Sequence, residues 1–350
     1  MKNILLLHYD LHFYRIFIYN VLDIELKKRN INLIVWPIRV LGNINDIKFN
    51  LLQKDFSFSE YKKVLQEKKI VTVVNFIQPK TPSMTFYLQI IFYAYLKGLN
   101  LVYYGHGVNL ESNSKLSNFM YNILHLMYKK IILYSPNEKK FLWHIHQKKI
   151  IIANNTLVLE NRHLLIEDSK DNLKKKYNIN AKFVILFSGR IEKRKKLELL
   201  IDFLAENYEK NINLIIVGPT QDDNLINRMK KNTNIIYFGP QYNTKVMSEL
   251  FFISDVFSIP GHIGLGIVEA FYWGLPVLTL NVKHAPEIYY LENGTNGFIL
   301  NNDRMFKEKI LELYNNPILL KKLSYNARQT YYNLARLDKM IYGIIEGVDF

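Results

Sequence analysis

Hydrophobic and polar positions alternate along the first half of the chain in blocks of two kinds. Short apolar runs at residues 3–7, 31–36, 71–76 and 101–104 predict strands, and longer amphipathic stretches at residues 15–28 and 84–96 predict helices. Strands that alternate with helices are typical of a parallel sheet. We therefore expect an α/β domain.

The same pattern returns after a polar stretch at residues 166–182, which is the best linker candidate. Strands are predicted at 183–187, 212–217, 235–238 and 256–259, and helices at 196–206, 223–231, 244–253 and 318–346. We expect two doubly wound Rossmann-like domains that face a central cleft, residues 1–168 and 169–325, with a C-terminal helix, residues 326–350, that packs back toward the first. Open parallel sheets bind ligands beyond the carboxyl ends of their strands.

Composition and charge narrow the function classes. The 350 residues include no cysteine, which excludes disulfides, thiolate catalysis and cysteine metal sites. The chain starts with a strand rather than a signal peptide, and no stretch has the length of a membrane span, so the expected location is the cytoplasm, including the inner face of the plasma membrane. The formal net charge of +15 favours nucleic acid, an anionic bilayer or phosphate-bearing substrates. Because no nucleic-acid module or uninterrupted basic helix is present, nucleic acid is not an expected partner.

A basic cluster follows the predicted strand at residues 183–187. Gly189 and Arg190 come at its end, and Lys195 stands just before the next helix. A guanidinium and an ammonium beside free helix amides form a receptor for a diphosphate. The alternative is a solvated basic loop.

A glycine-rich loop precedes another predicted helix. Gly264 and Gly266 would let a ligand approach the backbone closely, and Glu269 lies in the first turns of the helix. A carboxylate there can accept hydrogen bonds from the hydroxyls of a ribose. The alternative is a glutamate that only complements the helix dipole.

The order and spacing of these pieces resemble glycosyltransferase family 4, a GT-B fold family, over about residues 183–300. The motifs are Gly189-Arg190, Lys195, Ser254-Asp255-Val256-Phe257, Pro260, Gly264-Leu265, Glu269-Ala270, Gly274, Pro276-Val277 and Pro286-Glu287-Ile288. The resemblance implies that Arg190 and Lys195 bind the donor diphosphate, that Glu269 holds the ribose and that Gly239 lies beside the nucleobase. It also implies transfer with retention of configuration and without a metal, because the two cations replace Mg²⁺ and an Asp-x-Asp motif.

The chain departs from the family at one position. The family usually has a second glutamate eight residues before the ribose-binding one, and this chain has Gly261 there, followed by His262. Either His262 and backbone amides hold the donor sugar, or its recognition is unusual. The expected donor-binding residues are Gly189, Arg190, Lys195, Gly239, His262, Gly264, Leu265, Gly266 and Glu269.

The first half carries its sharpest feature at Tyr104-Gly105-His106-Gly107. Family members often have a histidine at the corresponding strand end, so His106 is the expected catalytic or sugar-orienting residue; the alternative is a turn histidine. Further candidates are Asp10 as a base, Arg15 toward an acceptor phosphate and Tyr14 as an acceptor or cleft residue, although such residues are more often structural. His8, His12 and Asp10 are weak evidence for a metal, and none is expected.

These features together predict a sugar-nucleotide-dependent glycosyltransferase, with UDP-sugars favoured, that acts on a glycan or lipid-linked saccharide in surface polysaccharide biosynthesis, for example of lipopolysaccharide. No cofactor is expected beyond the donor substrate. The alternatives are a sugar-nucleotide 2-epimerase of the same fold and a non-catalytic basic polyanion-binding protein. Two stretches, residues 15–28 and 118–130, are expected to be amphipathic helices. Their apolar sides are expected to lie in the core. The alternative is that these sides, together with the lysines, rest on an anionic bilayer.

Overall fold

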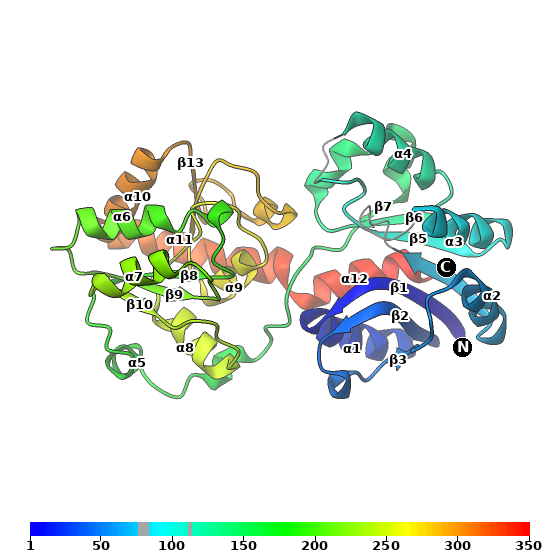
Figure 1. Ribbon diagram of the computed structural model, residues 1–350, viewed down its shortest axis with the longest axis horizontal. Coiled ribbons are helices and arrows are strands. Elements are labelled where there is room, and N and C mark those ends of the chain that lie inside the picture. Colours follow the sequence, from blue (N-terminus) through cyan, green and yellow to red (C-terminus); the bar gives the residue numbers. More distant parts are fainter. Residues whose placement is uncertain (76–83, 111–113) are drawn as a thin grey trace. The chain divides into compact units, whose positions relative to one another are not determined.

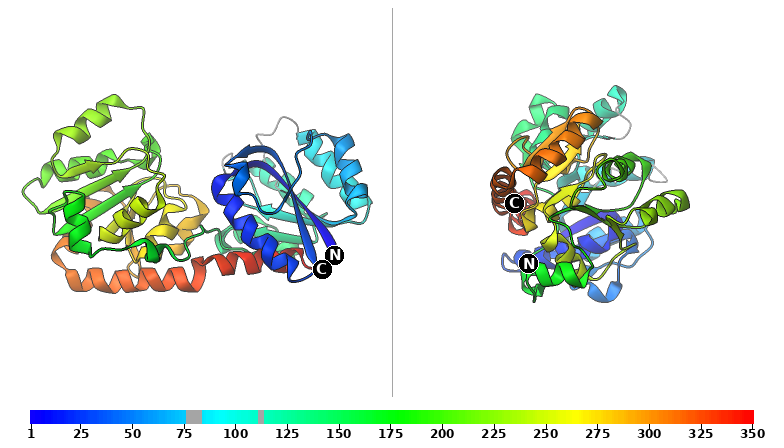
Figure 2. Two further views of the ribbon diagram at one scale, coloured as in Figure 1. Left: turned by 90° about the horizontal axis from the view of Figure 1, so that it is seen from below. Right: turned by 90° about the vertical axis from the view of Figure 1, so that its left-hand side faces the viewer.

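The structure, a computed structural model, describes residues 1–75, 84–110 and 114–350 (Figure 1). The chain divides into two compact units. Unit 1 consists of Met1–Val158 with Leu337–Phe350, and unit 2 consists of Leu159–Arg336. The two chain termini lie side by side in unit 1 (Figure 2), where the Lys2 ammonium donates to the carbonyl of Phe350.

Unit 1 is built on a parallel sheet in the order β3-β2-β1-β4-β5-β6-β7. The strands are β1 (Lys2–His12), β2 (Ile31–Leu41), β3 (Asn50–Leu51), β4 (Ile70–Asn75), β5 (Asn100–Gly105), β6 (Lys130–Leu133) and β7 (Ile150–Ile152). Alternate residues of β1 enter different cores, Ile4 and Leu6 on one face of the sheet and Leu5 and Leu7 on the other. Such strands are buried on both faces, as doubly wound sheets require.

Helices cover both faces of this sheet (Figures 1 and 2). Residues of α1 (Phe13–Lys27) and α12 (Leu337–Val348) belong to one core, and residues of α2 (Phe58–Glu67), α3 (Met84–Leu96) and α4 (Lys115–His125) belong to the other. Short 3-10 helices are η1 (Ile44–Asp46), η2 (Pro136–Phe141) and η3 (His144–Lys149).

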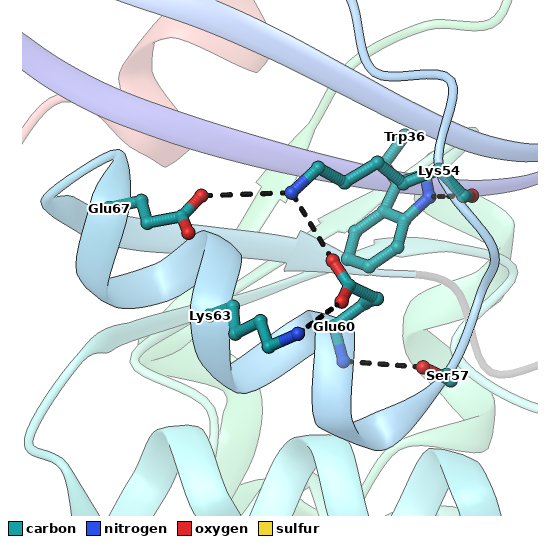
Figure 3. Close-up of polar contacts among 6 residues, drawn as sticks. All are labelled: Trp36, Lys54, Ser57, Glu60, Lys63 and Glu67. Carbon is teal, nitrogen blue, oxygen red and sulfur yellow. Dashed lines mark hydrogen bonds and ion pairs between the residues drawn. The ribbon is translucent and has the colours of Figure 1, made fainter.

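The start of α2 is fastened to β2 (Figure 3). The hydroxyl of Ser57 accepts from the amide of Glu60 at 3.2 Å and caps the helix. The Glu60 carboxylate pairs with Lys54 at 3.2 Å and Lys63 at 2.8 Å. The buried indole of Trp36 donates to the carbonyl of Lys54 at 3.0 Å. Because exposed ion pairs contribute little, the cap and the indole bond do most to fix this rim of unit 1.

Unit 2 is built on a second parallel sheet in the order β10-β9-β8-β11-β12-β13. The strands are β8 (Phe183–Ser188), β9 (Ile212–Val217), β10 (Ile235–Tyr237), β11 (Val256–Ser258), β12 (Val277–Leu280) and β13 (Gly297–Leu300). The chain runs outward from β8 to β10 and then returns to place β11 on the other side of β8. This reversal is a topological switch point, where doubly wound sheets bind ligands.

The helices of unit 2 are α5 (Lys170–Lys176), α6 (Glu198–Glu206), α7 (Asp223–Lys231), α8 (Thr244–Ile253), α9 (Gly266–Trp273), α10 (Asp303–Asn315) and α11 (Pro317–Thr330). Three 3-10 helices, η4 (Arg162–Leu165), η5 (Lys193–Lys195) and η6 (Pro286–Tyr290), and one π-helical turn, η7 (Tyr331–Ala335), complete the unit.

The boundaries between the units differ from those expected. Unit 2 begins at Leu159 rather than at residue 169, because η4 packs on α8. The linker candidate, residues 166–182, contains α5. At the other end the chain returns to unit 1 at Leu337 rather than at residue 326, and α12 buries Met340, Ile341 and Ile344 in the same core as α1. Polar composition therefore did not mark the boundary, because a short lysine-rich helix has the same composition as a linker.

Candidate functional site

Near the carboxyl end of β8 lies a lysine ammonium that has no partner among the described residues. Lys195 folds back over Gly189, where an added Cβ would lie 3.0 Å from the Lys195 Nζ. In the described part of the chain, Nζ makes no hydrogen bond or ion pair. Burial lowers the pKa of Lys195, and the nearby Arg194 lowers it further. An anion at this position would stabilise the charged form.

Next to Lys195, one carboxylate holds two guanidinium groups. Glu192 accepts from Arg194 Nε at 2.6 Å and from Arg190 Nη1 at 3.3 Å. The hydrogen bond from Arg194 lowers the pKa of Glu192. The Arg190 side chain is 75% exposed, so solvent and ligands can reach it. The role of Arg190 in diphosphate binding stays a prediction.

The loop after β11 packs directly on η5. The amides of Gly261 and His262 donate to the carbonyls of Lys195 and Arg194, each at 2.9 Å. A Cβ on Gly261 would lie 2.0 Å from the Arg194 carbonyl oxygen. No side chain fits there unless η5 moves. The glutamate that the family resemblance leads us to expect at position 261 would therefore clash with this backbone contact.

His262 is oriented by backbone groups. Its Nδ1 lies 3.0 Å from the carbonyl of Lys283, which can only accept, so Nδ1 carries the proton. Burial lowers the pKa of His262 and favours the neutral ring, whose Nε2 is then an acceptor. The neighbouring His284 uses both nitrogens internally, Nε2 with Leu280 at 2.8 Å and Nδ1 with the amide of Ile263 at 3.2 Å. Of the two rings, His262 is the one that can offer a nitrogen to a ligand.

Glu269 lies in the first turn of α9 and is paired with a residue that no sequence motif singles out. Its Oε1 accepts from Arg162 Nη1, in η4. Burial raises the pKa of Glu269, and Arg162 opposes this shift. Within the described residues, Oε2 has no hydrogen-bond partner. One turn further, the Tyr272 hydroxyl accepts from the amide of His163 at 2.9 Å, so two residues of α9 fasten η4. Because Arg162 and Glu269 are 107 positions apart, no local pattern links them.

The glycines of this site differ in what surrounds them. A Cβ on Gly266 would lie 3.0 Å from the Phe257 ring, so tight packing requires this glycine. A Cβ on Gly264 would meet only the Cβ of Ala285, at 3.6 Å, which leaves room for a ligand. Leu265 is the N-cap residue of α9, and no side chain caps this helix start. Gly239, expected beside a nucleobase, follows β10 with a φ of 65° and nothing within 4 Å of an added Cβ.

In unit 1, His106 follows β5 and is held by a buried carboxylate. Its Nδ1 lies 2.6 Å from Glu138 Oε1, and Glu138 Oε2 accepts from the amide of Ser135 at 2.9 Å. His106 is 42% exposed and Glu138 only 3%. The carboxylate accepts a hydrogen bond from Nδ1–H, so Nε2 of the neutral ring is an acceptor. Sequence reasoning missed Glu138, whose only signal is the capping-box pattern that starts at Ser135.

Arg15 is buried close to His106. Its guanidinium donates to the Tyr104 hydroxyl at 3.2 Å and to Asn155 Oδ1 at 3.1 Å. It lies 5.2 Å from the centre of the Tyr134 ring, and the same ring contacts the His106 ring at 4.7 Å. Tyr134 therefore connects Arg15 to His106. In the part of the chain that the structure describes, Arg15 has no carboxylate partner. Its contacts fix the base of the His106 loop, and contact with an acceptor stays a prediction.

The remaining candidates in unit 1 lie along the end of β1. Both oxygens of Asp10 accept from the Arg39 guanidinium, at 2.6 and 2.7 Å, across the β1–β2 pair. Tyr14 stacks on His12 with ring centres 5.7 Å apart. No group of three or more metal-binding side chains occurs among residues 1–75, 84–110 and 114–350. The expectation that no metal is needed is not tested by this geometry.

Two doubly wound units in one chain, each with an all-parallel sheet, define the GT-B class of fold, as the sequence predicted. Residues 169–330 match the family model of the glycosyl transferases group 1. The resemblance to glycosyltransferases is confirmed at this level, and the assignment to family 4 stays a prediction.

Comparisons with known proteins support this fold class. The chain is 30% identical over 167 residues to the alpha-monoglucosyldiacylglycerol synthase of Acholeplasma laidlawii, a match that covers 44% of this chain and 41% of that protein. Two solved structures share the fold over nearly their whole length. They are a glycosyltransferase from Rickettsia africae (TM-score 0.78, 17% identity, 99% of this chain and 97% of that one) and Anabaena HepE in complex with UDP (TM-score 0.75, 16% identity, 99% of both chains).

Proposed function

We propose that this protein is a glycosyltransferase that takes its sugar from a nucleoside-diphosphate sugar. The observation that supports this most strongly is the half-buried Lys195 ammonium, which has no partner among the described residues, at the switch point of the unit 2 sheet. A diphosphate supplies the negative charge that this ammonium lacks. Glu269 keeps Oε2 for a ribose hydroxyl, while Arg162 holds Oε1.

UDP-sugars are the favoured donors in this proposal. Anabaena HepE, which shares the fold, forms a complex with UDP, and this supports the same nucleotide here. Gly239 would lie beside the base. The donor sugar would meet His262, whose Nε2 is an acceptor and whose backbone is fixed on η5.

The proposed chemistry needs no metal and retains the anomeric configuration. The bond between the anomeric carbon and the diphosphate oxygen breaks, the acceptor oxygen forms the new bond, and its proton passes to the departing diphosphate. Lys195, Arg190 and the backbone amides of residues 264–266, at the start of α9, are proposed to stabilise the charge that develops on the diphosphate. His106, held by Glu138, is proposed to orient the sugar or the acceptor hydroxyl.

The acceptor is proposed to be a glycan or a lipid-linked saccharide of surface polysaccharide biosynthesis. The curated relative is named for a diacylglycerol lipid, which supports a lipid acceptor, although the match covers 41% of that protein.

The experiment measures UDP release and sugar products from UDP-glucose, UDP-galactose and UDP-N-acetylglucosamine. Each donor is incubated with and without mixed micelles that carry diacylglycerol or glucosyl-diacylglycerol, and with soluble oligosaccharides. A glycosyltransferase releases UDP faster when its acceptor is present and forms a glycosylated product. Acceptor-free conversion of the donor would indicate the epimerase instead. Neither reaction, together with salt-sensitive binding to a polyanion, would contradict the proposal and favour the polyanion-binding protein.

A further inference from the structure

Helix α4, labelled in Figure 1, has exposed apolar side chains along one face. Leu116, Phe119, Met120 and Ile123 follow the spacing of a single helix face and are 71%, 50%, 47% and 39% exposed. Helices of globular domains normally bury such a face. An exposed apolar stripe of this kind marks an interaction surface.

The opposite face of α4 explains why the helix cannot rotate to bury the stripe. His125 is fully buried, and its Nε2 donates to the carbonyl of Gly107 at 2.6 Å. The side-chain amide of Asn122 donates to the carbonyl of Phe141 at 3.1 Å and accepts from the backbone amide of Trp143 at 2.8 Å. Rotation would leave these buried polar groups unpaired, which costs more than the exposed apolar side chains.

The apolar surface continues beyond the helix. The rings of Phe119 and Trp143 lie 5.4 Å apart, and Trp143 itself is exposed. Ile145 and Leu126 are exposed on the same segment. We name this surface the α4 patch, and it consists of Leu116, Phe119, Met120, Ile123, Leu126, Trp143 and Ile145.

The segment that carries the α4 patch is strongly basic. Its only acidic residue between positions 114 and 150 is Glu138, which is buried and engaged with His106. The same segment contains seven lysines, Lys115, Lys129, Lys130, Lys139, Lys140, Lys148 and Lys149. Large apolar side chains flanked by lysines are suited to the interface of a bilayer with anionic headgroups.

We infer that the α4 patch docks unit 1 on an anionic phospholipid bilayer. None of the helices in the described part of the chain has the length and apolar character that a membrane span requires. A second copy of the chain fits the surface less well, because a two-fold contact would bring the same lysines together with no exposed acid of this segment to pair them. The inference rests on this surface alone and does not depend on the proposed transferase activity.

The test is vesicle flotation of the full chain with phosphatidylglycerol-containing vesicles and with pure phosphatidylcholine vesicles. The wild-type protein should float with the anionic vesicles, and salt should weaken this binding. Leu116→Ser with Phe119→Ser should lower the bound fraction by about tenfold, because burial of apolar side chains and attraction to headgroups both contribute to such binding. Lys140→Gln with Lys148→Gln should weaken binding to anionic vesicles only.

The matched control is Ile318→Ser with Tyr325→Ser, which removes two exposed apolar side chains from α11 without a change in charge. This variant should float like the wild type. The inference is wrong if the wild type does not bind anionic vesicles, or if both serine variants bind equally. Concentration-dependent dimerisation that only the α4 variant abolishes would replace the bilayer by a second copy. UDP binding, measured in the same samples, reports on the donor site separately.

Discussion

Glu138 determines which nitrogen of His106 carries the proton. The carboxylate is 3% exposed and has two hydrogen bonds, one with His106 Nδ1 and one with the amide of Ser135. A buried carboxylate in this position holds the ring in one orientation, in the same way that an acid orients the histidine of a catalytic triad. Glu138 is thus a positioning residue, and its effect must pass through His106.

Glu138→Gln should lower kcat by about tenfold to a hundredfold, a part of what a positioned acid–base group contributes. The Kd for UDP should stay within about twofold, because the predicted diphosphate ligands all lie in unit 2. The measurements are kcat, its pH profile and the Kd for UDP. Glu67→Gln, which removes an exposed carboxylate of α2, is the matched control. An unchanged kcat and pH profile would contradict the positioning role.

The contact between η5 and the loop after β11 brings two distant elements of unit 2 together. Lys195 and Arg194 present carbonyls, and Gly261 and His262 present amides, so the contact is made by backbone atoms. A glutamate at position 261 would need space that the Arg194 carbonyl occupies. The basic loop and the glycine-rich loop therefore form one structural element.

Gly261→Glu should destabilise unit 2 by about 2–4 kcal/mol, because the new side chain must displace η5. It should also weaken UDP binding, since Lys195 moves with η5. For thermal unfolding, Gly264→Ala is the control in the same loop, because its Cβ would meet only Ala285, at an ordinary contact distance of 3.6 Å. The measurements are thermal unfolding of both variants and UDP titration of Gly261→Glu and the wild type. A Gly261→Glu protein as stable as the wild type would show that the contact is not rigid.

Apolar runs predicted β1, β2, β4, β5, β8, β9, β10 and β11 and the sheet class, because a strand buried on both faces must be apolar throughout. The short strands β3, β6, β7 and β13 were not predicted. The same reasoning singled out Lys195, Gly189 and Glu269, which follow strands or open helices, and their part in donor binding stays a prediction. It missed Glu138 and Arg162, because each meets its partner only after the chain has folded. It also placed the unit boundary too late, since the exposed helix α5 is as polar as a linker. Predictions from one sequence thus succeed where local pattern determines burial and fail where distant residues meet.

Across its full length, the chain divides its predicted chemistry between two units with separate cores. Unit 2 holds the residues predicted to bind a donor, at the switch point between β8 and β11. Unit 1 holds His106, its buried partner Glu138 and the α4 patch. This division predicts that a substitution in one unit can remove the function of that unit and leave the function of the other unit intact. The variants described above test this prediction.

The proposed donor site depends above all on Lys195, which would make the switch point of unit 2 a diphosphate site. Calorimetric titration of UDP, GDP and ADP into the wild type, Lys195→Gln and Lys193→Gln tests this dependence. Both variants remove one lysine charge from η5, but Lys193 is exposed, whereas Lys195 lies against Gly189. We expect Lys195→Gln to weaken UDP binding by about tenfold to a hundredfold, as for a lost hydrogen bond to a charged group, and Lys193→Gln to change it by less than about threefold. Equal losses in both variants, or no nucleotide binding by the wild type, would contradict the diphosphate site.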